Sequence, residues 1–186
     1  MVSKKLNEFL TFSSSRFIAA SIFAVFWLFL ALFIPKTEYG EIGFIMSIVN
    51  VAAAISILGL ESTVLVFEPK KQNVYPASFI LVFISSCIAG IIVYFLTQNV
   101  FASILIVGFN VFTIVLAGLN SEKRYNLYSL HVISRAIVAV VVSVVLYYLF
   151  GINGIIFGYF ISSFLIIKEL FRLMKKNKID FYWRWK

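Results

Sequence analysis

Two charged side chains, Glu61 and Arg135, lie inside long apolar segments and are the residues best placed to do chemistry. Between Glu41 and Glu68, Glu61 is the only charged residue. An ionisable group inside an apolar, membrane-spanning segment needs a partner or water, which makes it a candidate functional residue. We expect Glu61 and Arg135 either to pair between helices or to line a polar cavity. Glu61 alternatively reaches the membrane interface or carries a coupling proton.

Further polar residues share helix faces with these two. At about 100° per residue, Ser47 and Asn50 fall on the face of Glu61, and His131 falls on the face of Arg135. Together they are expected to line a cavity that is open to the cytoplasm and carries net positive charge. The candidate cavity residues are Arg16, Asn50, Glu61, Asn110, His131 and Arg135.

The other four candidates also have simpler structural interpretations. Arg16 lies near the expected interface, where it is suited to bind anionic lipid headgroups. His131 is alternatively a packing residue. Asn50 and Asn110 alternatively join helices by hydrogen bonds, which are worth about 0.6 kcal/mol on average in a bilayer.

The elements that must position these residues follow from the composition. Of the 186 residues, 62% are hydrophobic and 18% aromatic, and the mean hydropathy is +1.01. Such values exclude an ordinary soluble domain. We predict an all-α polytopic membrane protein, with six transmembrane helices in one bundle over residues 1–186. The expected spans are 13–34, 42–67, 77–96, 100–119, 125–150 and 152–174, followed by a basic aromatic tail at 175–186.

Local patterns make the prediction more specific in three parts of this bundle. The segment PKTEYG at 35–40 is expected to form a tight polar connection, because proline ends a helix and glycine permits a turn. Residues 42–67 are expected to form one continuous helix. In the last span, Gly154, Gly158 and Ser162 are spaced four apart, which predicts close packing against a neighbouring helix.

The distribution of basic residues predicts the orientation. Of the 16 Lys and Arg residues, all except Lys36 and Arg135 lie on the side of the N-terminus. Basic residues accumulate on the cytoplasmic side of membrane proteins, so both termini are expected in the cytoplasm, in the plasma membrane. The formal charge of +8 flanks apolar spans, which favours anionic lipid headgroups or an anionic substrate as partners rather than nucleic acid.

The sequence has no motif typical of an enzyme or a metal centre. HExxH, GxSxG, Walker A, GxGxxG and CxxC patterns are all absent. The single histidine, His131, and the single cysteine, Cys87, cannot build a metal site of the usual kind or an intrachain disulfide. We therefore expect neither enzymatic activity nor a cofactor.

Residues 9–71 resemble the N-terminal part of the polysaccharide-exporting flippases of the multidrug/oligosaccharidyl-lipid/polysaccharide exporter superfamily. Those proteins have a loop like leucine-Gly-Pro-Glu-Tyr-Gly after the first span, and a second span that ends in Gly-Leu. The matching residues here are Ile34, Pro35, Glu38, Tyr39 and Gly40, followed by Gly59 and Leu60.

This resemblance implies an N-terminal six-helix lobe that faces a second lobe across a central cavity. It also implies transport of lipid-linked sugars by alternating access, with cationic cavity residues engaging the lipid pyrophosphate. By position, Arg16 is the first-span cation that the resemblance suggests. Family members often carry arginine just before the Gly-Pro loop, where this chain has Phe33.

The leading hypothesis is thus a transporter lobe, or half-transporter, for lipid-linked oligosaccharide or polysaccharide precursors. Its expected partners are the lipid bilayer, the lipid-linked sugar, and a second six-helix lobe or a second copy of the chain. The alternatives are a non-transporting membrane subunit that packs with partner helices, and a cation-coupled exporter of small amphiphiles. A truncated chain, a natural half-transporter and a subunit that has lost transport would each explain a single lobe.

Overall fold

The computed structural model describes residues 2–70 and 72–176, with side chains from residue 11 onward. Within these ranges the chain is helical, and no strand occurs. Six segments are long and apolar enough to cross a membrane, which confirms the predicted all-α polytopic bundle. They are Thr11–Phe33, Lys36–Ser56, Tyr75–Thr97, Val100–Ser121, Tyr125–Phe150 and Ile152–Lys176.

Four of the six predicted spans are single helices, and the predicted second and sixth spans are divided. The undivided helices are α1 (Val2–Phe33), α4 (Tyr75–Thr97), α5 (Val100–Ser121) and α6 (Tyr125–Phe150). The second span consists of α2 (Lys36–Ser56), followed by the short α3 (Leu60–Phe67) and a 3₁₀ turn, η1 (Glu68–Lys70). The sixth consists of α7 (Ile152–Ser163), a 3₁₀ turn, η2 (Phe164–Ile166), and α8 (Ile167–Lys176).

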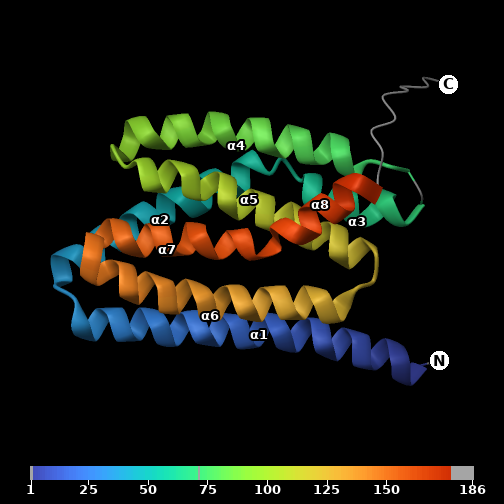
Figure 1. The fold of residues 1–186 in the computed structure, drawn as a ribbon, viewed down its shortest axis with the longest axis horizontal. Helices are drawn as coiled ribbons and strands as arrows, with labels where there is room; N and C mark the ends of the chain where they lie inside the picture. The colour runs from blue at the N-terminus through green and yellow to red at the C-terminus, as the bar shows by residue number, and fades with distance from the viewer. Residues whose placement is uncertain (1, 71, 177–186) are drawn as a thin grey trace.

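Helices α5 and α7 form the centre of the bundle (Figure 1). Helix α5 packs against α2, α3 and α4 on one side and against α7 on the other, while α7 packs on α6 and α6 on α1. Helices α1 and α2 make few contacts, although they are consecutive in the chain. Figure 1 shows α1 and α4 at opposite edges, and α3, α8 and the start of α1 at the same end of the bundle.

Small residues allow the close contact between α6 and α7. A Cβ atom added at Gly154 would collide with the carbonyl group of Leu146, and one added at Gly158 would collide with Ser143. Ser162 is fully buried on the same helix. The close packing predicted from the spacing of these small residues is therefore confirmed.

The second span departs from the prediction, because residues 42–67 do not form one continuous helix. Helix α2 ends at Ser56, and Leu58 and Gly59 take left-handed backbone angles, with φ of 53° and 69°. Two successive left-handed residues cannot continue a right-handed helix, so the chain turns before α3 begins at Leu60. Glycine adopts this conformation without steric cost, which explains its place at the break.

Two other parts of the chain also differ from the prediction. The segment 35–40 is not a turn, because α2 begins at Lys36 and only Ile34 and Pro35 separate it from α1. Pro35 directly precedes α2, and its φ of −55° is compatible with the start of a helix. Helix α1 begins at Val2, and the part of it that is apolar enough to cross a membrane is Thr11–Phe33, close to the predicted 13–34. The sixth span is interrupted by η2, and the basic aromatic tail lies outside the described residues from 177 onward.

Ion pairs attach α8 to the turn between α5 and α6. Arg172 lies 3.0 Å from Glu122 and 2.7 Å from Glu169, and Lys176 lies 2.6 Å from Glu122. Arg124 lies 3.7 Å from Glu169. Several basic residues at this end of the bundle therefore have carboxylate partners within the chain.

The glycine contact predicts a large difference between two otherwise similar substitutions. Gly154→Ala is expected to destabilise the bundle by about 1–3 kcal/mol, because the added methyl group forces α6 and α7 apart. Gly43→Ala is the matched control, since a Cβ at Gly43 meets nothing within 4 Å. Thermal unfolding in detergent measures both variants, and equal stability of the two would contradict the close packing described here.

Candidate functional site

A polar cavity of about 560 Å³ lies among α1, α2, α3, α5, α6 and α7. It forms because α1 packs along α6 while α2 packs on α4 and α5, so that the first two helices diverge. Helix α7 packs on both α5 and α6 and so connects the two groups of helices. The cavity is lined by Phe23, Trp27, Met46, Asn50, Ala53, Ala54, Ile57, Glu61, Phe109, Asn110, Thr113, Arg135 and Tyr159.

The structure brings together four of the six predicted site residues. Asn50, Glu61, Asn110 and Arg135 all line this cavity, although they come from four different helices. A volume of this size is typical of sites that bind small molecules, which range from about 300 to 1,000 Å³. The expectation that charged residues of separate spans share one cavity is met by Glu61 and Arg135.

Arg135 is held between aromatic rings and has no acidic partner. Its guanidinium carbon lies 4.7 Å from the ring centre of Phe109 and 4.3 Å from that of Phe112. Its Nε atom is buried without a hydrogen-bond partner, and no ion pair among the described residues includes it. Cation–π contacts of this kind contribute about 0.5–2 kcal/mol each, but they leave the positive charge uncompensated.

Glu61 lies in the first turn of α3, directly after the break in the second span. It is partly buried, and no side-chain hydrogen bond or ion pair joins it to another described residue. The ion pair considered for Glu61 and Arg135 is therefore not formed, although both groups face the same cavity. Although the break separates α3 from α2, Glu61 still lines the same cavity as Asn50 and Ala54 of α2, as helical periodicity predicted.

Asn110 acts mainly as a structural residue at this break. Its side-chain amide donates hydrogen bonds to the hydroxyl groups of Ser56, at 2.7 Å, and Ser86, at 2.9 Å. The hydroxyl of Ser85 donates to the carbonyl oxygen of Ser56 at 2.5 Å, which satisfies a backbone group that the interrupted helix leaves without its usual partner. These bonds join α2, α4 and α5, as the structural interpretation of Asn110 predicts.

Asn50 differs from Asn110 although both line the cavity. Asn50 is exposed, and its amide makes no hydrogen bond within the described part of the chain. It does not join helices, so the structural alternative considered for it is wrong. Its amide is available to a molecule in the cavity.

Arg16 and His131 lie outside the cavity. The Nε of Arg16 donates a hydrogen bond to the hydroxyl of Tyr128 at 2.7 Å, and its guanidinium carbon lies 4.8 Å from the ring centre of Phe12. The bond to Tyr128 joins α1 to α6, and the contact with Phe12 lies within α1. Arg16 is not one of the lining residues, which corrects the prediction that it lines the cavity. His131 is half-buried on α6 and is not one of the lining residues, so its shared face with Arg135 does not bring it to the site.

The cavity also contains aromatic residues that the sequence-based prediction, which considered polar and charged residues, did not include. Trp27 and Tyr159 line it, and the hydroxyl of Tyr159 is buried. Phe109 and Phe112 are three residues apart on α5, so one helix face presents both rings to Arg135. In the sequence, Tyr159 stands out as a tyrosine in the middle of the apolar segment 152–167, which could have indicated a polar site on that helix.

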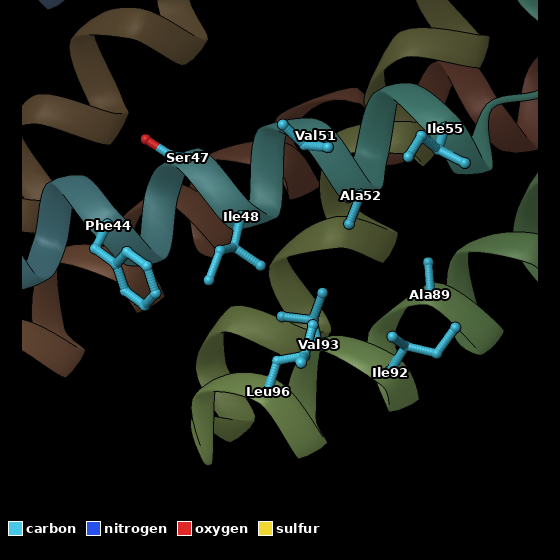
Figure 2. Close-up of a pocket in the computed structure, with 10 residues that line it drawn as sticks. All are labelled: Phe44, Ser47, Ile48, Val51, Ala52, Ile55, Ala89, Ile92, Val93 and Leu96. Atoms are coloured by element: carbon cyan, nitrogen blue, oxygen red, sulfur yellow. The ribbon is translucent and has the colours of Figure 1, made fainter.

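A second hollow lies between α2 and α4 and is apolar (Figure 2). Its volume is about 490 Å³, and Figure 2 shows side chains such as Ile48 of α2 and Val93 of α4 facing each other across it. Ser47 lies at this hollow rather than at the cavity, and its hydroxyl donates to the carbonyl of Gly43 at 2.7 Å. The polar face predicted for Ser47, Asn50 and Glu61 is therefore divided between two hollows.

Comparison with protein-family models, with curated proteins and with solved structures finds no match to this chain.

The two cavity asparagines predict opposite outcomes for the same substitution. Asn110→Ala is expected to destabilise the bundle by about 1–3 kcal/mol, because two serine hydroxyl groups lose their buried donor. Asn50→Ala is expected to change the free energy of unfolding by less than about 0.5 kcal/mol, because Asn50 makes no such bond. Denaturant unfolding in detergent measures both; an equal loss in the two variants would refute the structural role of Asn110.

Proposed function

We propose that this chain is a lobe of a membrane transporter, or a half-transporter, that flips lipid-linked oligosaccharide or polysaccharide precursors by alternating access. The observation that carries the proposal is the cavity with Arg135, whose guanidinium has aromatic neighbours but no acidic partner. Arg135 lies about 15 Å along α6 from Tyr125, near the middle of the span. An uncompensated cation at that depth is suited to an anionic group such as a lipid phosphate.

The basic residues support an orientation with both termini in the cytoplasm of the plasma membrane. In this orientation, Glu61 lies nearer the cytoplasmic side than Arg135. The phosphate-linked headgroup enters from that side, and the apolar tail stays among the lipids. The sparse contact between α1 and α2 leaves room for a second lobe to complete the cavity, either from the same polypeptide or from another chain.

The apolar hollow between α2 and α4 favours a second candidate function. A non-transporting subunit would use such a surface to pack against a partner helix, and the hollow is lined almost entirely by apolar side chains. That role would not explain why the unpaired charges of Glu61 and Arg135 line the polar cavity. The two functions are separated by whether loss of Arg135 affects lipid movement.

The transport proposal predicts that Arg135→Gln lowers the rate of flipping at least tenfold. A charge-assisted hydrogen bond contributes about 1.5–3 kcal/mol, and each 1.4 kcal/mol corresponds to a factor of ten. The measurement uses proteoliposomes that contain a fluorescent lipid diphosphate sugar, with chemical quenching of the probe that remains outside.

Lys36→Gln is the matched control for this experiment, because it removes a basic side chain that is exposed and lies outside the cavity. It is expected to flip the probe at the wild-type rate. Elution as a single folded species in detergent checks that Arg135→Gln retains its structure. Flipping at the wild-type rate by Arg135→Gln would remove Arg135 from the mechanism.

A further inference from the structure

We infer that the cavity receives a headgroup that carries an ammonium group as well as a phosphate. The inference rests on the proposed function and narrows its substrate class. It begins from two groups of opposite charge, Glu61 and Arg135, that line one cavity and yet do not pair with each other or with any other described residue.

The two charges stand apart because different elements hold them. Phe109 and Phe112 contact the guanidinium of Arg135 from α5, while Glu61 belongs to α3 beyond the break in the second span. Their nearest charged atoms are more than 4.0 Å apart, beyond the limit for an ion pair. Both groups therefore face the same cavity as unpaired charges.

The charge of the ligand follows from this arrangement. A purely anionic group bound to Arg135 is repelled by Glu61, and a purely cationic group bound to Glu61 is repelled by Arg135, since charges interact strongly where water is scarce. A neutral ligand satisfies neither group. A ligand with both charges pairs with Arg135 through its phosphate and with Glu61 through its ammonium group.

The remaining polar side chains are compatible with such a ligand. Asn50 is exposed at the cavity and offers an amide that can donate or accept. Asn110 already donates its amide hydrogens to Ser56 and Ser86, so its amide has no free donor for a ligand. The volume of about 560 Å³ accommodates more than the charged part of a headgroup, which leaves room for a sugar.

Trp27 provides a reporter inside the cavity. The other two tryptophans, Trp183 and Trp185, are changed to phenylalanine so that fluorescence reports Trp27 alone. The protein is kept in maltoside micelles, which carry no charge or phosphate. Three probes are titrated: phosphoethanolamine with both charges, ethyl phosphate with only the phosphate, and ethanolamine with only the ammonium group.

We expect phosphoethanolamine to bind at least tenfold more tightly than ethyl phosphate and ethanolamine. Glu61→Gln is expected to weaken phosphoethanolamine binding to the level of ethyl phosphate, and Arg135→Gln to abolish binding of both phosphates. Glu41→Gln is the matched control, because it removes an exposed carboxylate outside the cavity and should leave all three affinities unchanged. If Glu61→Gln fails to fold, Glu61→Asp keeps the charge and should keep the preference, and the wild-type comparison of the probes is decisive by itself.

The outcomes separate this inference from the proposed function. Equal affinity for phosphoethanolamine and ethyl phosphate, or a preference that survives Glu61→Gln, overturns the ammonium requirement and leaves the phosphate site intact. Tightest binding of ethanolamine, or no binding of either phosphate, overturns both and favours an exporter of cationic amphiphiles or a non-transporting subunit.

Discussion

The buried hydrogen bonds of Asn110 hold the bundle together at the point where its second span is interrupted. A bilayer offers no water to the free carbonyl and N–H groups at a helix break, so neighbouring side chains must take over their hydrogen bonds. Here the hydroxyl of Ser85 does so, by donating to the carbonyl oxygen of Ser56. Asn110 joins the hydroxyl groups of Ser56 and Ser86, so that side chains of three helices meet directly before the break.

The two kinds of positive charge in the molecule have different surroundings. At the end of the bundle, Arg172 and Lys176 contact Glu122, and Arg124 lies close to Glu169, so these charges are largely compensated. Inside the bundle, the guanidinium of Arg135 lies against Phe109 and Phe112 and has no carboxylate partner among the described residues. The total charge of the chain therefore says little about the site, because one unpaired arginine at the cavity has more influence on a ligand than several paired ones at the surface.

Much of this fold could be predicted from the sequence, because a helix that crosses a membrane needs a long uninterrupted apolar segment. The length of the apolar segment could not predict the break in the second span. Leu58 and Gly59 keep the segment apolar, but their backbone angles end the helix. Helical periodicity brought Asn50 and Arg135 to the cavity correctly. It failed for His131, because a shared face does not say which neighbour that face meets. The cavity role predicted for Arg16 also failed, because Tyr128 and Phe12 contact Arg16 instead.

Helix α2 is a wall shared by two hollows of opposite character. Met46, Asn50 and Ala53 line the polar cavity, while residues between them in the sequence, such as Ile48 and Val51, line the apolar one. The residues that line the polar cavity and those that line the apolar hollow therefore alternate along the same helix. Any turn of α2 about its long axis must therefore reshape both hollows together, which makes the polar and the apolar surfaces of this protein mechanically coupled.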